Sequence, residues 1–179
     1  MNEAKAVLEF WQEAGPKKWF VKDDGFDKAI WTRFGELHKR ACKGALAHWQ
    51  GEAENALALI LVLDQFSRNM FRNDARAFTQ DAMGLKTAKA SIATGFDQAV
   101  LPSLRQFFYM PLMHSESIID QQACVHLFHE LGQPEGLKFA ILHRDIIARF
   151  GRFPHRNKVL KRKTTPLEER FLDEGGFSG

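Results

Sequence analysis

The run Ala56–Leu63 (ALALILVL) is apolar on every side and is the longest such run in a chain of 179 residues. We predict that it lies within a long helix over residues 54–72. A helix that is apolar all round has no face to turn toward water, so this one should lie at the centre of the fold. Its apolar run is also far shorter than the ~20 residues that a membrane-spanning helix needs. The run therefore predicts a buried central helix and no membrane span.

The segments on either side of this run also have helical spacing. Between residues 23 and 44, apolar side chains recur every three or four positions, at Phe26, Ile30, Phe34, Leu37 and Ala41, which is the period of one helix face. Further helices are expected over residues 2–14, 74–95, 103–110, 111–131 and about 136–150, and after Thr165, where TPLE forms a capping box. The final DEGGFSG indicates a frayed end. We predict one all-α domain, residues 1–179, of about eight or nine helices in antiparallel hairpins.

Composition and cysteine usage indicate a globular protein of the cytoplasm. Apolar residues make up 45% of the chain and charged residues 26%, as in ordinary soluble domains. Cys42 and Cys124 are far apart and lack the spacing of metal ligands, so we expect reduced thiols. The stretch MNEAKAVLEFW has an early acid and no apolar core, which does not match a secretory signal.

Positive charge is concentrated in one region. Residues 144–163 contain eight Lys or Arg residues and a single acid, Asp145, whereas the rest of the chain has 17 basic and 21 acidic residues. A local basic region of this kind argues against a general nucleic-acid coat and for one anion-facing site. Nucleic-acid binding is therefore the least favoured of three interpretations.

The helices expected over 111–131 and 136–150 should form an antiparallel hairpin, because about five residues join them. On a helical wheel that begins at Pro111, Glu116 and Asp120 project into or beside the apolar sector, where an unpaired carboxylate is costly. The antiparallel register places Arg149 and Arg152 opposite these acids. We therefore predict a largely buried salt bridge from Glu116 to Arg149 or Arg152.

The open end of this hairpin is the candidate site. Histidines and carboxylates move protons, and arginine forks hold carboxylates and phosphates. The predicted catalytic residues are His114, Glu116 and His155, and the predicted ligand-binding residues are Arg68, Asn69, Asp120, Arg149, Arg152, Arg156 and Asn157. Asp64–Asn69 (DQFSRN), which supplies two of these, forms either a network at a helix end or the floor of a pocket. His143 lies in an apolar stripe, which favours a core role. Adjacent arginines disfavour a bound metal, and no cofactor motif is present.

Four stretches also carry a resemblance to a known family. LALILVLDQFSRNMFR, PLMHSESIIDQQ, HRDIIARFGRFPHRN and TTPLEE resemble the bacterial family catalogued as domain of unknown function 924. The resemblance covers nearly the whole chain and implies a right-handed array of the tetratricopeptide-like superfamily, but no activity. It implies motif positions at Asp64, Gln65, Arg68, Asn69, His114, Ser115, Glu116, Asp120, Gln121, His143, Arg149, Arg152, Pro154, His155, Arg156 and Asn157. One departure is Lys161, where the family tends to have a glycine.

Two functional hypotheses follow from these observations. The first is a site for a small anionic metabolite, which could extend to hydrolytic or acid–base catalysis with Glu116 or His114 as base and Arg152 and Arg156 as anion clamp. The alternative is a scaffold that binds a protein partner on a concave surface, with the motif residues acting as a structural latch.

Overall fold

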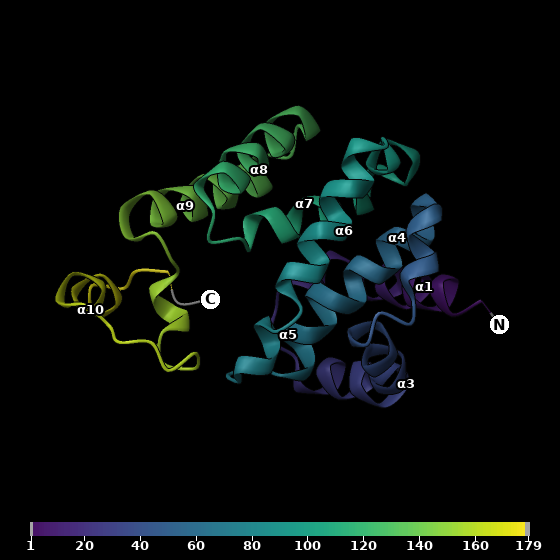
Figure 1. Cartoon of the computed structure of the whole chain (residues 1–179), viewed down its shortest axis with the longest axis horizontal. Coiled ribbons are helices and arrows are strands. Elements are labelled where there is room, and N and C mark those ends of the chain that lie inside the picture. The colour runs from purple at the N-terminus through teal and green to yellow at the C-terminus, as the bar shows by residue number, and fades with distance from the viewer. Residues whose placement is uncertain (1, 178–179) are drawn as a thin grey trace. The chain divides into compact units, whose positions relative to one another are not determined.

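Helices make up the regular structure of residues 2–177, the part of the chain that the computed structural model describes (Figure 1). No residue in that range lies in a strand, so the predicted all-α class is confirmed. The α-helices are α1 (Glu3–Ala14), α2 (Pro16–Trp19), α3 (Asp24–Cys42), α4 (Ala53–Ile60), α5 (Ser67–Met70), α6 (Asp81–Ala93), α7 (Pro102–Met113), α8 (Ile118–Leu131), α9 (Pro134–Phe150) and α10 (Pro166–Asp173). Between them lie the 3₁₀ turns η1 (Ala47–Gly51), η3 (Ala75–Phe78), η4 (Phe96–Ala99) and η5 (Pro154–Arg156) and the π-helical η2 (Leu61–Phe66).

The chain divides into two compact units. The first contains residues up to 72 together with 76–111, and the second contains 73–75 and the residues from 112 onward. The folding of residues 1–179 as one domain remains a prediction.

The predicted central helix forms the core of the first unit. Every side chain from Ala56 to Phe66 is buried, because the run has no polar face before Asp64. Aromatic rings of other segments pack around it, and Trp11 contacts Trp19, Phe66 and Phe107 with ring centroids 5.5–6.1 Å apart. Within residues 2–177, no helix is both long and apolar enough to cross a membrane.

A π-helical turn interrupts this central helix. The expected single helix over 54–72 is α4, η2 and α5 in succession. A π turn holds an extra residue and so changes which side chains face the core. Asp64 is consequently 1% exposed and Gln65 is 6% exposed, and the Gln65 amide donates to the Asp64 carboxylate at 2.6 Å.

The second unit is built on the predicted hairpin of α8 and α9, which lie side by side (Figure 1). Gly132 ends α8 in the left-handed conformation, with φ 68°, and Pro134 begins α9 at its first turn. These are the positions at which glycine and proline favour a helix end and a helix start. The capping box of α10 is also present, since the Thr165 side chain and Glu168 exchange hydrogen bonds with each other's backbone N–H groups.

The helix predicted over 111–131 is wrong. α7 continues through Pro111 to Met113, residues 114–117 are not helical, and α8 begins at Ile118. The break is stabilised by polar side chains that replace helical hydrogen bonds. The Gln121 amide donates to the carbonyls of Met113 and Ser115, at 2.7 Å each. Because the helix starts later, Ile119 is 73% exposed rather than buried, and the core face of α8 consists of Asp120, Gln121, Cys124 and Phe128.

The end of the described chain is packed rather than frayed. Phe177 is partly buried against Ile146, Ile147 and Phe153. Residues 178–179, which were also expected to fray, lie outside the described residues.

The close approach of α8 and α9 predicts a strong effect of one glycine. A Cβ at Gly136 would lie 2.5 Å from two ring carbons of Phe128, a ring that is 1% exposed. We expect Gly136→Ala to lower the free energy of unfolding by about 1–3 kcal/mol. At Gly35, in α3, a Cβ would meet nothing within 4 Å, so Gly35→Ala should raise stability by about 0.5–1 kcal/mol. Urea unfolding of both variants measures the contrast, and equal effects would contradict the α8–α9 packing.

Candidate functional site

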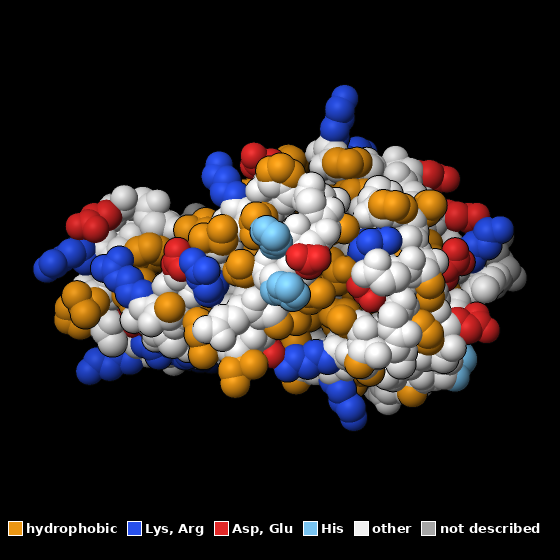
Figure 2. Space-filling view, turned by 90° about the horizontal axis from the view of Figure 1, so that it is seen from above, with side chains coloured by type: hydrophobic (Ala, Val, Ile, Leu, Met, Phe, Trp, Pro, Cys, Tyr) orange, Lys and Arg blue, Asp and Glu red, His pale blue; other side chains and the backbone are white. Residues whose placement is uncertain are grey.

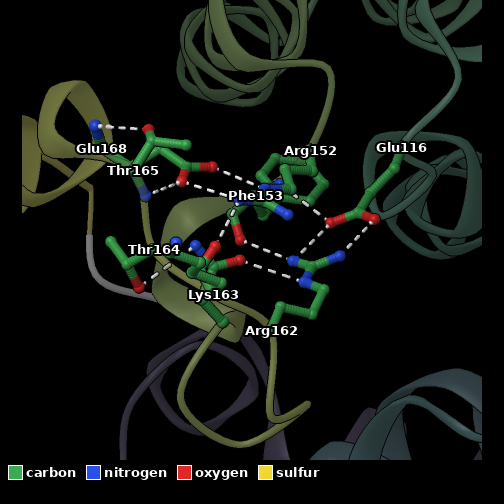
Figure 3. Close-up of polar contacts among 9 residues, drawn as sticks. Glu116, Arg152, Phe153, Arg162, Lys163, Thr164, Thr165 and Glu168 are labelled. Carbon is green, nitrogen blue, oxygen red and sulfur yellow. Dashed lines mark hydrogen bonds and ion pairs between the residues drawn. The ribbon is translucent and has the colours of Figure 1, made fainter.

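Glu116 is held by Arg162, an arginine that the hairpin argument did not consider. The two side chains form a bidentate ion pair, with Nη1 to Oε2 at 2.7 Å and Nη2 to Oε1 at 3.0 Å (Figure 3). The Glu116 carboxylate also accepts the Phe153 backbone N–H at 2.8 Å. The predicted salt bridge to Arg149 or Arg152 is therefore wrong, and so is the prediction of a largely buried pair, because the Glu116 side chain is 30% exposed. The register failed because Glu116 lies before the start of α8.

Besides binding Glu116, Arg162 makes hydrogen bonds that hold its own loop in place. Its Nε donates to Asn157 Oδ1 at 3.0 Å and its Nη2 donates to the Phe153 carbonyl at 2.9 Å. Its backbone N–H closes a turn onto the Asn157 carbonyl at 2.8 Å. Lys161 sits in this turn with φ 54°, a conformation that favours glycine. At the position where the family resemblance implies a glycine, the turn is therefore formed with a lysine in the left-handed region.

Arg152 is engaged by a second carboxylate, Glu168 of α10. Its Nε and Nη2 reach the two carboxylate oxygens at 2.5 and 2.8 Å, and Nη2 also donates to the Lys163 carbonyl at 2.8 Å (Figure 3). Glu168 is 2% exposed. The hydrogen bond from Arg152 is the main reason that the pKa of Glu168 falls to about 2, although burial opposes it. Arg152 therefore contacts this acid and not Glu116.

These contacts make one structural element, which we call the latch: Glu116, Arg152, Asn157, Arg162 and Glu168. It joins the segment before α8 to the loop around η5 and to α10. Bidentate arginine–carboxylate pairs fix both distance and orientation. In the latch, each guanidinium already faces a carboxylate.

Three lysines of this region and Arg149 face solvent. Lys158, Lys161 and Lys163 are exposed, and on the face drawn in Figure 2 blue side chains gather at the left, where Figure 1 draws α10 and the loop before it. Arg149 is exposed on α9 and stacks on Phe150 and Phe171, with its guanidinium carbon 4.8 and 5.7 Å from the ring centroids. It does not face the carboxylates that the register assigned to it.

A second group of side chains, which we call the imidazole cluster, lies beside the latch: His143, Phe153, His155, Arg156 and Phe177. Arg156 is 6% exposed and stacks on Phe153 at 4.4 Å. The two imidazoles contact Phe153 as well, at 5.4 and 5.6 Å between ring centroids. The Nδ1 atom of His143 donates to the Phe139 carbonyl at 2.8 Å, since a carbonyl can only accept. His143 is thus 6% exposed and hydrogen-bonded, as its position in an apolar stripe predicted.

His155 is the unusual member of the cluster. Its Nδ1 is buried and is without a hydrogen-bond partner among the described residues. Burial and then the nearby Arg156 and His143 lower the pKa of His155 to about 3. Glu116 opposes this shift, and His114 adds to it. Asp120, a predicted ligand-binding residue, accepts a hydrogen bond from Ser115 Oγ at 2.7 Å.

Arg68 and Asn69 belong to the first unit and form a network at a helix end. Arg68 binds the Asp81 carboxylate in a bidentate pair at 3.0 and 3.1 Å and lies 3.1 Å from Asp64 Oδ1. Asn69 donates to Asp27 at 2.7 Å. Of the two interpretations of DQFSRN, these contacts favour the network. In residues 2–177, no group of three or more His, Cys, Asp or Glu side chains is arranged to hold a metal ion.

Sequence reasoning missed Arg162, Glu168 and Phe177. Arg162 was counted only as part of the basic region, and Glu168 only as part of a capping box. Phe177 was assigned to a frayed end. All three lie in or next to irregular segments, where no helical period indicates a facing partner.

The chain belongs to the family described as bacterial protein of unknown function (DUF924), whose model matches residues 7–176. Its fold is similar to the structure of a protein of unknown function, ATU0120, from Agrobacterium tumefaciens, with a TM-score of 0.93 and 46% sequence identity. The similarity covers 97% of this chain and 98% of the Agrobacterium chain. No curated protein matches the sequence.

A double-mutant cycle should show a strong coupling within the latch. We expect Glu116→Ala and Arg162→Ala to couple by more than about 1 kcal/mol in the free energy of unfolding, because bidentate hydrogen bonds join partly buried groups. The control pair is Glu36 and Lys39, whose side chains are 85% and 61% exposed and should couple by about 0.2–0.5 kcal/mol. A latch coupling no larger than the control would refute this account.

The lowered pKa of His155 predicts an acid-dependent loss of stability. Above pH 6.5, the ordinary histidine pKa, the imidazole is neutral in the folded and unfolded states. As the pH falls from there toward 3, only the unfolded state gains this proton, so stability declines. Between pH 7 and 5.5 the decline should be smaller in His155→Gln by about 1 kcal/mol. Urea unfolding at the two pH values measures it, and identical declines would place the folded pKa near its ordinary value.

Proposed function

We propose that the second unit binds a small anion at the imidazole cluster, with His155 and Arg156 as the groups that contact it. The observation that supports this most directly is the buried Nδ1 of His155, which is without a hydrogen-bond partner among the described residues. Buried polar atoms are nearly always hydrogen-bonded, and an exception calls for an explanation. A ligand oxygen that accepts from Nδ1 would provide one.

The charge around His155 favours an anion over a cation or a neutral ligand. Arg156, His143 and His114 act on His155 in the sense of added positive charge, whereas Glu116 acts in the opposite sense. Arg156 is 6% exposed. A guanidinium in a place with little water interacts strongly with carboxylate or phosphate oxygens. We assign the anion clamp to Arg156, which also acts on the Glu116 carboxylate, rather than to Arg152, which is bound to Glu168.

Any proton transfer to or from the anion falls to a histidine in this proposal. Burial tends to raise the pKa of Glu116, but hydrogen bonds from Arg162 and Phe153 outweigh it and hold that pKa below its ordinary value. A carboxylate that is paired and weakly basic is a poor general base at neutral pH. His155, whose pKa an incoming anion would raise again, is better suited, with His114 as the alternative.

A partner-binding scaffold is the second candidate, and the latch is the observation that favours it. Arg152 and Arg162 both bind carboxylates of the same unit, which is what a purely structural role for the motif residues requires. In that proposal the helices form a tetratricopeptide-like right-handed array, and the protein partner binds elsewhere on it.

Inorganic phosphate is the probe that tests the anion site. At ten times its Kd, a ligand of the folded state stabilises by about 1.4 kcal/mol. We expect phosphate to raise the Tm of the protein more than chloride does at equal ionic strength, and to shift the NMR signals of the His155 imidazole. Arg156→Gln and His155→Gln should each remove the phosphate-specific part of both effects.

Arg149→Gln is the matched control, because it removes one exposed cation from the same unit. Its response to phosphate should equal that of the unaltered protein. Equal Tm shifts in all variants would mean nonspecific screening, would overturn the anion site and would leave the scaffold as the better proposal.

A further inference from the structure

We propose that Phe177 is a displaceable cover of the imidazole cluster, and that the anion which displaces it carries an aromatic ring. This inference rests on the proposed anion site and specifies its ligand class. The Phe177 ring lies edge-on against both imidazoles, with its centroid 4.6 Å from His143 and 5.2 Å from His155. It thus packs on the same side chain, His155, whose Nδ1 is without a hydrogen-bond partner among the described residues.

The backbone before Phe177 is shaped to bring its ring to this place. After α10, Gly175 has φ 81°, a left-handed conformation that favours glycine. The Gly176 N–H donates to the Phe171 carbonyl at 2.9 Å. A Cβ at Gly176 would lie 2.4 Å from that same oxygen, so the close approach requires a residue without a side chain. Two adjacent glycines therefore direct Phe177 back onto the cluster.

The contacts of the Phe177 ring are of a kind that a ligand could replace. They are ring contacts to two imidazoles and packing against the cluster of Ile146, Ile147 and Phe153. Edge-to-face ring contacts are individually weak, and Phe177 itself is only partly buried. An aromatic ring from a ligand could make the same contacts with His143 and His155.

An aromatic anion could make both the ring contacts with the imidazoles and the polar contacts with His155 and Arg156. Its ring would take the place of Phe177 between the imidazoles, while its oxygens would accept from His155 Nδ1 and pair with Arg156. Inorganic phosphate could make only the polar contacts, because it has no ring. The ligand class is therefore an aryl phosphate or an aryl carboxylate, in which the ring and the anion are joined.

Phe177→Ala tests the cover, with phenyl phosphate and inorganic phosphate as the two probes. Removing the ring frees its contacts for the ligand ring, so phenyl phosphate should bind Phe177→Ala about tenfold more tightly than the unaltered protein. Inorganic phosphate should gain about threefold or less, because it has no ring to fill the space. Calorimetry on the full chain measures both Kd values. Phe20→Ala, which removes an exposed phenyl ring from the first unit, should change neither.

NMR of the histidine ring protons reports directly on the position of Phe177. Phe177→Ala should shift the signals of His143 and His155, which lie within the ring-current range of Phe177, and leave those of His48 unchanged. If Phe177→Ala left the Kd values of both phenyl phosphate and inorganic phosphate unchanged, the proposed cover would be overturned and the anion site would stand. Binding of neither probe to either protein would overturn the anion site and the cover together.

Discussion

The ion pair between Glu116 and Arg162 is the interaction on which the geometry of the second unit depends. The Arg162 guanidinium donates to the Glu116 carboxylate, to the side-chain oxygen of Asn157 and to the Phe153 carbonyl. The same carboxylate also accepts a hydrogen bond from the Phe153 backbone N–H. The backbone at Phe153 is therefore held through both its N–H and its carbonyl. That fixed residue separates Arg152, which turns to Glu168, from His155 and Arg156, which join the imidazole cluster. The residue fixed by this ion pair thus separates Arg152, a member of the latch, from the side chains of the imidazole cluster.

Much of the fold could be predicted because its helices follow simple periodic rules. The central helix was predicted from an apolar run without a polar face, and the α8–α9 hairpin from the short connection between two helical segments. The failure at residues 111–131 has a specific cause. Side chains such as Gln121 replace the backbone hydrogen bonds that a continuous helix would have made. Helix propensity alone does not reveal where a side chain will do this. The π-helical turn at η2 was missed for a similar reason, since its sequence keeps the apolar composition of an α-helix.

For the candidate site, the sequence predicted the kind of interaction but not its partners. It was sound to argue that Glu116 needs a cation, because a carboxylate near a core is costly without one. The choice of Arg149 or Arg152 relied on a helical register, and the cation came instead from a loop that has no register.

The length of chain between latch partners has a consequence for how the second unit assembles. Glu116 and Arg162 are 46 residues apart, whereas Arg152 and Glu168 are 16 apart. Closing the longer loop costs more conformational entropy, and α8 and α9 occupy most of it. Pairing of those helices shortens the effective loop before the ion pair can form, so hairpin formation should precede closure of the latch. Because Phe177 follows every latch residue in the chain, the imidazole cluster would be the last part of the unit to acquire its shape during synthesis.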